Sequence, residues 1–227
     1  MTIKARKLKE LELPGKTELY EVTKSCDISV EEKQSDGSLD QVILEYRVEE
    51  NCVGYFAKEY RPADVPKNGS KVIDITAVML SKANKCVRWY LYDVKDTLGG
   101  ENTVMKLYNQ WNSGLRYLQQ NILNHVQGYS VFPNLGVITR CYDEERMKRL
   151  RDEFQKRCDE IENYPRKMTL LQRKDRTMIG KYRANLKVTQ AILDRKFEPE
   201  NGTDTYIINI EQLLSENDRI YKMKFLV

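Results

Sequence analysis

Residues 71–95 read KVIDITAVMLSKANKCVRWYLYDVK and contain two runs with the composition of β-strands. The runs, 72–80 and 86–94, are rich in Val, Ile, Thr, Trp and Tyr, which are enriched in strands. The residues between them, 81–85, are mostly polar, as is usual for a turn. The stretch is therefore predicted to form a β-hairpin.

Two carboxylates and a lysine interrupt the apolar character of this hairpin. Asp74 lies near the start of the first run, and Asp93 lies near the end of the second. Lys95 follows Asp93 by two residues, so both side chains are expected on one face of the strand, because successive side chains alternate. If the hairpin turns about Ala83 and Asn84, Asp74 lies directly opposite Asp93.

This register predicts a metal site at the open end of the hairpin. Directly opposed Cβ atoms lie roughly 5 Å apart, and two carboxylates that close repel each other unless one is protonated or a cation lies between them. A divalent metal bound by oxygen atoms keeps both ionised near neutral pH. Lys95 could offset the charge of a phosphate or of its transition state. A shift of one residue in the turn would instead send the carboxylates to opposite faces.

Composition limits the class of protein. The chain has 227 residues, which suits one large or two small domains, and its 41% hydrophobic content can support a core. No apolar run approaches the roughly 20 residues of a membrane helix, and the basic N-terminus has no apolar signal region. We therefore expect a cytoplasmic protein without a membrane partner.

Cysteine and histidine usage narrows the chemistry further. The five cysteines are scattered and form no CxxC motif, which favours reduced thiols over disulfides or zinc. The single histidine, His125, follows an apolar helical run and is expected to be structural or solvent-facing. A histidine-based metal cluster and a Ser–His or Cys–His catalytic pair are therefore not expected.

Positive charge is concentrated in one stretch. Residues 166–196 contain ten Lys and Arg residues but only two acidic residues, although the formal net charge of the whole chain is +4. Such a stretch on an otherwise mildly acidic chain suggests a polyanionic partner, with nucleic acid the first candidate. The alternative is a solvated helical face without a ligand.

The part of the chain before the hairpin is predicted to be mostly strand. Residues 18–30 and 41–48 have strand composition, and the link between them contains Asp36-Gly37, a hairpin signal. Residues 54–60 could form a short helix or a further strand. Residues 61–70 contain two prolines and a glycine, which predicts a loop.

A helix is predicted over residues 103–125, because apolar residues recur every three or four positions on one face. Asn102 or Thr103 could cap it. Pro133 is expected to keep the first half of the next strand out of a central ladder. The remaining elements are predicted to be that strand, a charged helix closed by Pro165, a basic helix weakened by Gly180, and two strands, at residues 128–140, 143–163, 170–197, 205–210 and 220–227.

The order strand, loop, strand with Asp74, strand with Asp93-Val94-Lys95, helix, strand resembles the PD-(D/E)xK nuclease superfamily. The resemblance extends from about residue 42 to residue 140. It implies an α/β (α+β) fold in which a mixed central β-sheet is flanked by helices, with a restriction-endonuclease-like core. The corresponding division is an N-terminal β extension (1–40), the nuclease-like core (41–141), and a basic helical region with C-terminal strands packed on the core (142–227).

The resemblance also implies roles for individual residues. Asp74 and Asp93 would be ligands of Mg²⁺ or Mn²⁺, and Lys95 would position or activate the attacking water. An additional acid often comes from an upstream helix in this superfamily, for which Glu59 is the first candidate and Glu45 the second. Gln110 lies where several members place a glutamine near the active site. The chain departs from the family at the name-giving proline, where it has Ile73.

The function expected from these features is metal-dependent hydrolysis of phosphodiester bonds in DNA rather than RNA, and analogy suggests a place in a microbial restriction or anti-phage defence system. A protein partner or a homo-oligomer would be compatible with this role. Two alternatives are a catalytically inactive nucleic-acid-binding subunit and a protein-interaction module whose charged C-terminal helices dock a partner. Backbone phosphates would be contacted, without choice of sequence, by Arg173, Lys174, Arg176, Lys181 and Arg183.

Overall fold

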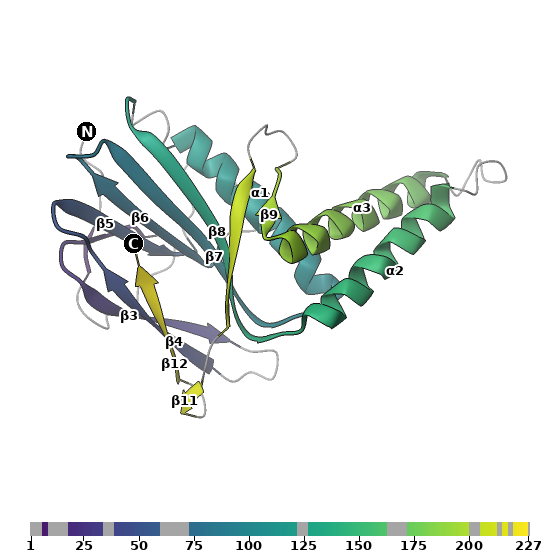
Figure 1. Ribbon diagram of the computed structural model, residues 1–227, viewed down its shortest axis with the longest axis horizontal. Helices are drawn as coiled ribbons and strands as arrows, with labels where there is room; N and C mark the ends of the chain where they lie inside the picture. Colours follow the sequence, from purple (N-terminus) through teal and green to yellow (C-terminus); the bar gives the residue numbers. More distant parts are fainter. Residues whose placement is uncertain are drawn as a thin grey trace.

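The structure, a computed structural model, describes residues 6–8, 18–33, 39–59, 73–121, 127–162, 172–199, 205–212, 215–217 and 220–226. Within these residues the chain forms two β-sheets and three helices (Figure 1). The fold class is therefore mixed α/β with a large mixed sheet, which confirms the prediction from the sequence.

The large sheet has eight strands, in which the central four follow one another along the chain. β5, β6 and β7 pair antiparallel, whereas β7 and β8 pair parallel and β10 is parallel to β8. The order of strands across the sheet is β1 (Arg6–Lys7), β2 (Tyr20–Val22), β5 (Cys52–Lys58), β6 (Ile75–Ser81), β7 (Cys86–Leu98), β8 (Ser130–Tyr142), β10 (Tyr206–Gln212) and β9 (Lys196–Phe197).

The hairpin of β6 and β7 has the predicted register. Ser81 pairs with Cys86, and the ladder continues in step to Ile75 opposite Tyr92. The first strand is shorter than expected, because it begins at Ile75 and Asp74 lies in a bend immediately before it. Asp74 is nevertheless at the position that faces Asp93 if the ladder is continued by one pair.

The second sheet has four strands and contains the strand expected at residues 41–48. Its order is β11 (Ser215–Asn217), β12 (Ile220–Leu226), β4 (Leu39–Arg47) and β3 (Cys26–Lys33). The strand that opens the family-like stretch is therefore not beside β6, and β5 takes that position instead. β5 also decides residues 54–58 of the ambiguous stretch in favour of a strand, whereas Tyr60 lies outside the described residues. The link with Asp36-Gly37 and the loop at 61–70 lie outside the described residues.

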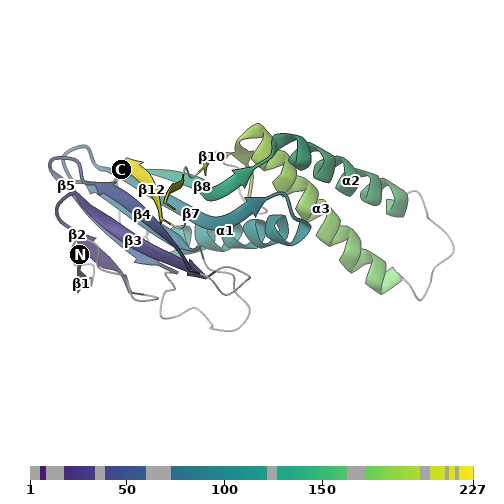
Figure 2. The same cartoon turned by 90° about the horizontal axis from the view of Figure 1, so that it is seen from below.

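The molecule has three layers: helices, the large sheet and the second sheet (Figure 2). Alternation along β7 divides its side chains between the layers. Trp89 and Leu91 face the helices, where they share a core with Trp111 and Val188. Tyr92 faces the second sheet and packs with residues of β4.

The helices are α1 (Glu101–Asn121), α2 (Glu144–Glu162) and α3 (Gln172–Asp194). α1 begins earlier than predicted: the Val104 amide donates to the Gly100 carbonyl at 3.1 Å, so neither Asn102 nor Thr103 is the cap. The sequence-based boundary was wrong because the chain leaves β7 through Gly99 (φ 155°) and Gly100, and this allows the helix to start at once. His125 and Pro165 lie outside the described residues.

β8 accommodates Pro133 where, within the described residues, the strand pairs with β7 alone. Pro133 lies opposite Trp89 of β7, and β10 begins to pair with β8 only at Leu135. The first part of β8 therefore pairs with β7, but it lies beyond the part of the strand that pairs with β10. A proline is tolerated there because no second strand of the described part needs its missing amide hydrogen.

Tyr46 ties the second sheet to the large one. Its side chain is fully buried, and its hydroxyl oxygen lies 2.9 Å from the Val78 carbonyl and 3.2 Å from the Tyr55 carbonyl. A Cβ atom at Gly54 would lie 2.8 Å from the Tyr46 ring, so the glycine makes room for it. Burial raises the pKa of Tyr46 far above its ordinary value, so the hydroxyl remains a hydrogen-bond donor.

We expect Tyr46→Phe to lower the free energy of unfolding by about 1–3 kcal/mol, because it leaves buried carbonyl groups without this donor. Urea denaturation measures the change. Tyr129→Phe is the matched control, because the Tyr129 hydroxyl makes no hydrogen bond to any described residue, and it should change stability by less than about 0.5 kcal/mol. Equal effects of the two substitutions would contradict a role for Tyr46 in joining the sheets.

All five cysteines are free thiols, as their scattered spacing predicted. None of the helices in the described part of the chain is both long enough and apolar enough to cross a membrane.

Candidate active site

β7 places Asp93 and Lys95 under the helical layer. Both side chains continue the row of Trp89 and Leu91, which pack against the helices. Asp93 is fully buried, and the Lys95 side chain is 14% exposed, so the lysine reaches the edge of the core while its neighbour does not. A carboxylate at the end of an apolar row is costly to bury unless a charge or hydrogen bonds compensate it.

Asp74 joins this pair from the bend before β6. Its Oδ2 atom accepts a hydrogen bond from the Val94 amide at 2.9 Å and one from Lys95 Nζ at 3.0 Å. The Asp74 side chain thus accepts the hydrogen bond of the Val94 amide. In a longer β6 ladder, a backbone carbonyl would accept that hydrogen bond instead. This gives a local reason why the strand begins at Ile75 and why Asp74 and Asp93 still meet.

Lys95 Nζ lies among three oxygen atoms. They are Asp74 Oδ2 at 3.0 Å, the Val94 carbonyl oxygen at 3.1 Å and Asp93 Oδ1 at 3.4 Å. We call these three atoms the oxygen cage. The predicted convergence of two carboxylates and a lysine is therefore present, with a backbone carbonyl that sequence spacing alone did not identify.

The charges in this cluster do not balance, because two carboxyl groups face one ammonium group. Burial raises the pKa of Asp93, Lys95 lowers it and Asp74 raises it again, and the result lies well above the ordinary value. Burial lowers the pKa of Lys95, but the charges of Asp93 and Asp74 outweigh burial, and the pKa of Lys95 is raised. Lys95 therefore stays charged, while Asp93 tends to keep a proton in the absence of a further cation.

The donor set suits a hard divalent cation. Asp93 Oδ2 is buried and has no hydrogen-bond partner among the described residues, which leaves one carboxylate oxygen available inside the site. Mg²⁺ and Mn²⁺ prefer carboxylate, carbonyl and water oxygens, all of which could be supplied here. Across the described residues, no three Asp, Glu, His or Cys side chains gather as a metal-binding group. The Val94 carbonyl and water would have to complete the coordination.

α1 brings Gln110 to the cluster, as the sequence had suggested. Gln110 is buried, and its Nε2 atom lies 3.5 Å from Asp74 Oδ1. The helix approaches closely because of Gly114, one turn later, where a Cβ atom would lie 2.8 Å from Ile73 Cγ1. Gly114 thus leaves room for the close approach of α1 that brings Gln110 to Asp74.

The two candidates for an additional acid are placed differently. The Glu59 amide donates to the Asp74 carbonyl at 2.9 Å, so its backbone borders the site, but it follows strand β5 and does not come from a helix among the described residues. Glu45 belongs to β4 of the second sheet and pairs with Arg47 at 3.1 Å. Because Glu45 alternates with the buried Leu44 and Tyr46, it faces away from the large sheet, and the structure does not bring it to the carboxylate cluster.

The basic stretch is tied to acids of the other helices. Lys181 Nζ lies 3.8 Å from Glu101 Oε1 of α1, and Arg183 forms an ion pair with Glu162 of α2. The other predicted phosphate contacts, Arg173, Lys174 and Arg176, lie in the first turns of α3, with side chains outside the described residues.

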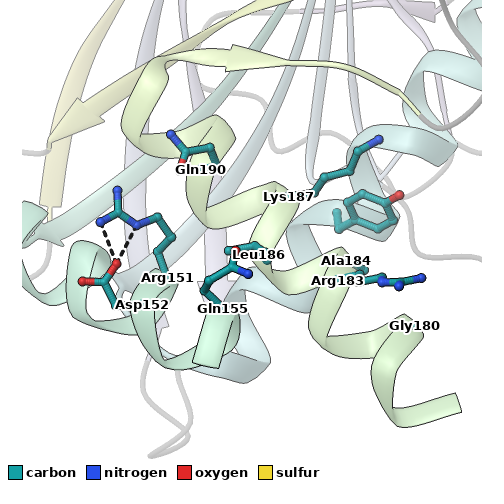
Figure 3. A pocket seen from close by; sticks show the side chains of 10 residues that line it. Arg151, Asp152, Gln155, Gly180, Arg183, Ala184, Leu186, Lys187 and Gln190 are labelled. Atoms are coloured by element: carbon teal, nitrogen blue, oxygen red, sulfur yellow. Dashed lines mark hydrogen bonds and ion pairs between the residues drawn. The ribbon is translucent and has the colours of Figure 1, made fainter. Parts of the chain in front are cut away.

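A groove of about 790 Å³ lies beside this basic helix, lined by α2, α3 and Tyr108 of α1 (Figure 3). Lys187 contributes positive charge to its wall, whereas Arg183 is paired with Glu162 and Arg151 donates hydrogen bonds of 2.8 and 2.6 Å to Asp152. None of Asp74, Asp93, Lys95 and Gln110 lines the groove. The groove and the carboxylate cluster are therefore two separate features of the helical side of the molecule.

No protein-family model, curated protein or solved structure matches this chain. The class of protein is consequently not shown by similarity. A proposal about function has to rest on the carboxylate–lysine cluster and on the strands that position it.

Proposed function

We propose that this protein is a metal-dependent nuclease that hydrolyses phosphodiester bonds of DNA. The observation that carries the proposal is the meeting of Asp74, Asp93 and Lys95 in one cluster beneath α1, in which Asp93 is fully buried. The order of elements supports it: the strand after Asp74, the strand with Asp93 and Lys95 and the next strand are neighbours in a single sheet, and α1 lies between the last two along the chain. This is the order on which the resemblance to the PD-(D/E)xK superfamily rests.

In this proposal Asp74, Asp93 and the Val94 carbonyl hold one divalent cation, Mg²⁺ or Mn²⁺. When bound, such a cation lowers the pKa of a water molecule and polarises a phosphoryl oxygen. Lys95 places a positive charge beside the phosphate, where negative charge grows in the transition state. Gln110 holds Asp74 in position through its amide group. The helical layer excludes bulk water from Asp93, which strengthens each of these electrostatic interactions.

The proposal is tested by cleavage of plasmid and single-stranded DNA with Mg²⁺, with Mn²⁺ and with EDTA. Nicking or degradation that needs the metal and is lost in Asp74→Asn supports a nuclease with its site at the hairpin. Cleavage that persists in Asp74→Asn would point to a contaminant or to another site. Absence of cleavage under all conditions, with a correctly folded protein, would contradict the proposal for the isolated chain.

The predicted phosphate contacts can be tested through the ion pair of Arg183. If Arg183 binds DNA, it must leave Glu162, so we expect Glu162→Gln to raise DNA affinity and Arg183→Gln to lower it. Arg183→Gln should also reduce the slope of log affinity against log salt by about 0.9, the value for one phosphate contact. Fluorescence anisotropy at several salt concentrations measures both effects.

Glu160→Gln provides the matched control for this experiment, because Glu160 pairs with the exposed Lys156 on the same helix. It removes the same charge from α2 without releasing Arg183. Equal affinities of Glu162→Gln and Glu160→Gln proteins would show that Arg183 only braces the helices.

A second candidate function is that of a protein-interaction subunit without catalysis. α2 and α3 pack against each other and extend beyond the sheets (Figures 1 and 2). The ion pairs of Lys181 and Arg183 reduce the charge they can offer to phosphate. Binding of a partner that is unaffected by salt and by DNA, together with no cleavage, would favour this role. A place in a restriction or anti-phage system remains an analogy within either proposal.

A further inference from the structure

We propose that Lys95 is an internal competitor for the divalent cation: its ammonium group fills the oxygen cage in the metal-free protein and leaves it when the cation binds. The inference rests on the metal site of the proposed function, but it does not depend on cleavage. It concerns the order of events at the site, since the lysine becomes available to a phosphate only after the cation has displaced it.

The lone pairs of Asp74 Oδ2 provide the first reason. This oxygen accepts hydrogen bonds from the Val94 amide and from Lys95 Nζ, at 2.9 and 3.0 Å. A carboxylate oxygen has about two acceptor positions, so both are taken. A cation that binds this oxygen has to remove one donor, and the backbone amide is fixed by the sheet. The lysine is therefore the donor that moves.

The other cage atoms lead to the same conclusion. Lys95 Nζ is also within hydrogen-bond range of Asp93 Oδ1 and the Val94 carbonyl, at 3.4 and 3.1 Å. The Val94 carbonyl and the Asp93 carboxylate are also the groups proposed to hold the cation, and Mg²⁺ binds oxygen at only about 2.0–2.1 Å. An ammonium ion and a divalent cation cannot share so small a space, because both steric overlap and charge repulsion oppose it.

Lys95 has a route out of the cage. Its side chain is 14% exposed, close to the 16% of Asp74, whereas that of Asp93 is fully buried, so the lysine and Asp74 lie nearer to solvent than Asp93 does. A lysine side chain has a flexible four-carbon stem and can move its charge without moving the backbone. Asp93 Oδ2, which has no hydrogen-bond partner among the described residues, offers an entering cation its first strong ligand.

The test compares metal affinity in the wild-type protein, Lys95→Met and Lys95→Arg, without DNA. Binding of Mn²⁺ is followed by the loss of the free-ion signal in electron paramagnetic resonance. Suppose that Lys95 is outside the oxygen cage in one metal-free molecule in ten or fewer. Lys95→Met should then bind Mn²⁺ at least about 10-fold more tightly than wild type. Lys95→Arg keeps the positive charge and should show no such gain.

A double variant locates the effect. The gain of Lys95→Met should disappear in Lys95→Met/Asp93→Asn, because the buried ligand is then missing. Equal or weaker Mn²⁺ binding by Lys95→Met, or a gain that survives the Asp93→Asn change, would overturn the inference. No detectable binding to any of the proteins would overturn it as well.

A measurement on the wild-type protein avoids dependence on a variant that could fail to fold. Acylation of lysines, read by mass spectrometry, reports whether Lys95 Nζ is held in the cage. We expect the modification of Lys95 to increase when Mn²⁺ is added, while that of the exposed Lys156 stays constant. Unchanged modification of Lys95 at saturating Mn²⁺ would overturn the inference.

The two proposals can fail separately. Tighter Mn²⁺ binding by Lys95→Met without any DNA cleavage by the wild type would support the competition and contradict the nuclease. Metal-dependent cleavage by the wild type, together with an Mn²⁺ affinity of Lys95→Met equal to that of the wild type, would support the nuclease and overturn the competition.

Discussion

Asp93→Asn is expected to abolish metal-dependent cleavage while leaving the protein at least as stable as the wild type. Loss of the buried ligand should lower the cleavage rate by about 10³-fold, in the range found when one group that stabilises transition-state charge is removed. Stability should not fall, because the wild-type cluster holds two carboxyl groups against one ammonium. With asparagine at this position, Lys95 and Asp74 remain as a balanced pair.

The pH dependence of stability separates this explanation from ordinary damage to the fold. The folded-state pKa of Asp93 is raised, so between about pH 4, where an unfolded aspartate titrates, and that raised value the folded state binds more protons than the unfolded state. The contribution of Asp93 to stability therefore falls as pH rises through this window. Asparagine does not titrate, so the variant lacks this pH-dependent loss. The free energy of unfolding of Asp93→Asn, relative to that of the wild type, should therefore increase as pH rises.

Urea denaturation in EDTA at pH 5 and pH 8 measures this difference, and the plasmid assay measures cleavage. Asp159→Asn, a change of an exposed carboxylate on α2, should alter neither quantity. A loss of stability in Asp93→Asn that is the same at both pH values would contradict the charge imbalance. Cleavage at the wild-type rate would remove Asp93 from the active site.

Gly136→Ala is expected to lower the free energy of unfolding by about 3 kcal/mol. Gly136 of β8 lies opposite Tyr92 of β7, and the tyrosine ring covers it on the face toward the second sheet. A Cβ atom would overlap three ring atoms of Tyr92, two of them at a distance of 2.5 Å. The ring cannot withdraw without disturbing the core between the two sheets, where it is 4% exposed.

A second substitution should rescue this defect if the overlap is its cause. In the Tyr92→Leu background the ring is absent, so Gly136→Ala should cost less than about 1 kcal/mol, and the two changes should be strongly non-additive. Gly180→Ala is the control, because no atom of the described residues lies within 4 Å of a Cβ atom there and alanine favours the helix. Equal losses from Gly136→Ala with and without the Tyr92 ring would contradict the explanation.

The candidate site was predictable because its parts are close in the sequence and follow the alternation of a strand. Asp93 and Lys95 share a face by spacing alone, and the polar residues at 81–85 fixed a register that brought Asp74 to Asp93. The bend at Asp74 and the role of the Val94 carbonyl were not predictable, because they depend on backbone hydrogen bonds between two strands. Glu59 illustrates the same limit, since only its backbone is shown to meet Asp74.

The basic stretch and the second sheet show where local patterns stop being informative. A count of charges in residues 166–196 cannot detect that Lys181 and Arg183 meet Glu101 and Glu162, because these acids lie on other helices. β4 has ordinary strand composition, and nothing in that composition indicates that its partner is β12 instead of β6. Such partners are chosen by the burial of whole faces, which is decided only when the chain is assembled.

The parallel pairing of β12 with β4 has a consequence for how the molecule forms. Ile220 lies beside Gln41 and Leu226 beside Arg47, so the two strands are about 180 residues apart along the chain, and folding slows as the sequence separation of contacts grows. The hairpin of β6 and β7 can close early, because its strands are joined by a short turn. The second sheet must wait for residues 220–226, and until then β4 presents an unpaired edge that favours association with other chains. Refolding is therefore expected to be slow, although the carboxylate cluster itself is local. The fraction of protein lost to aggregation should increase with protein concentration.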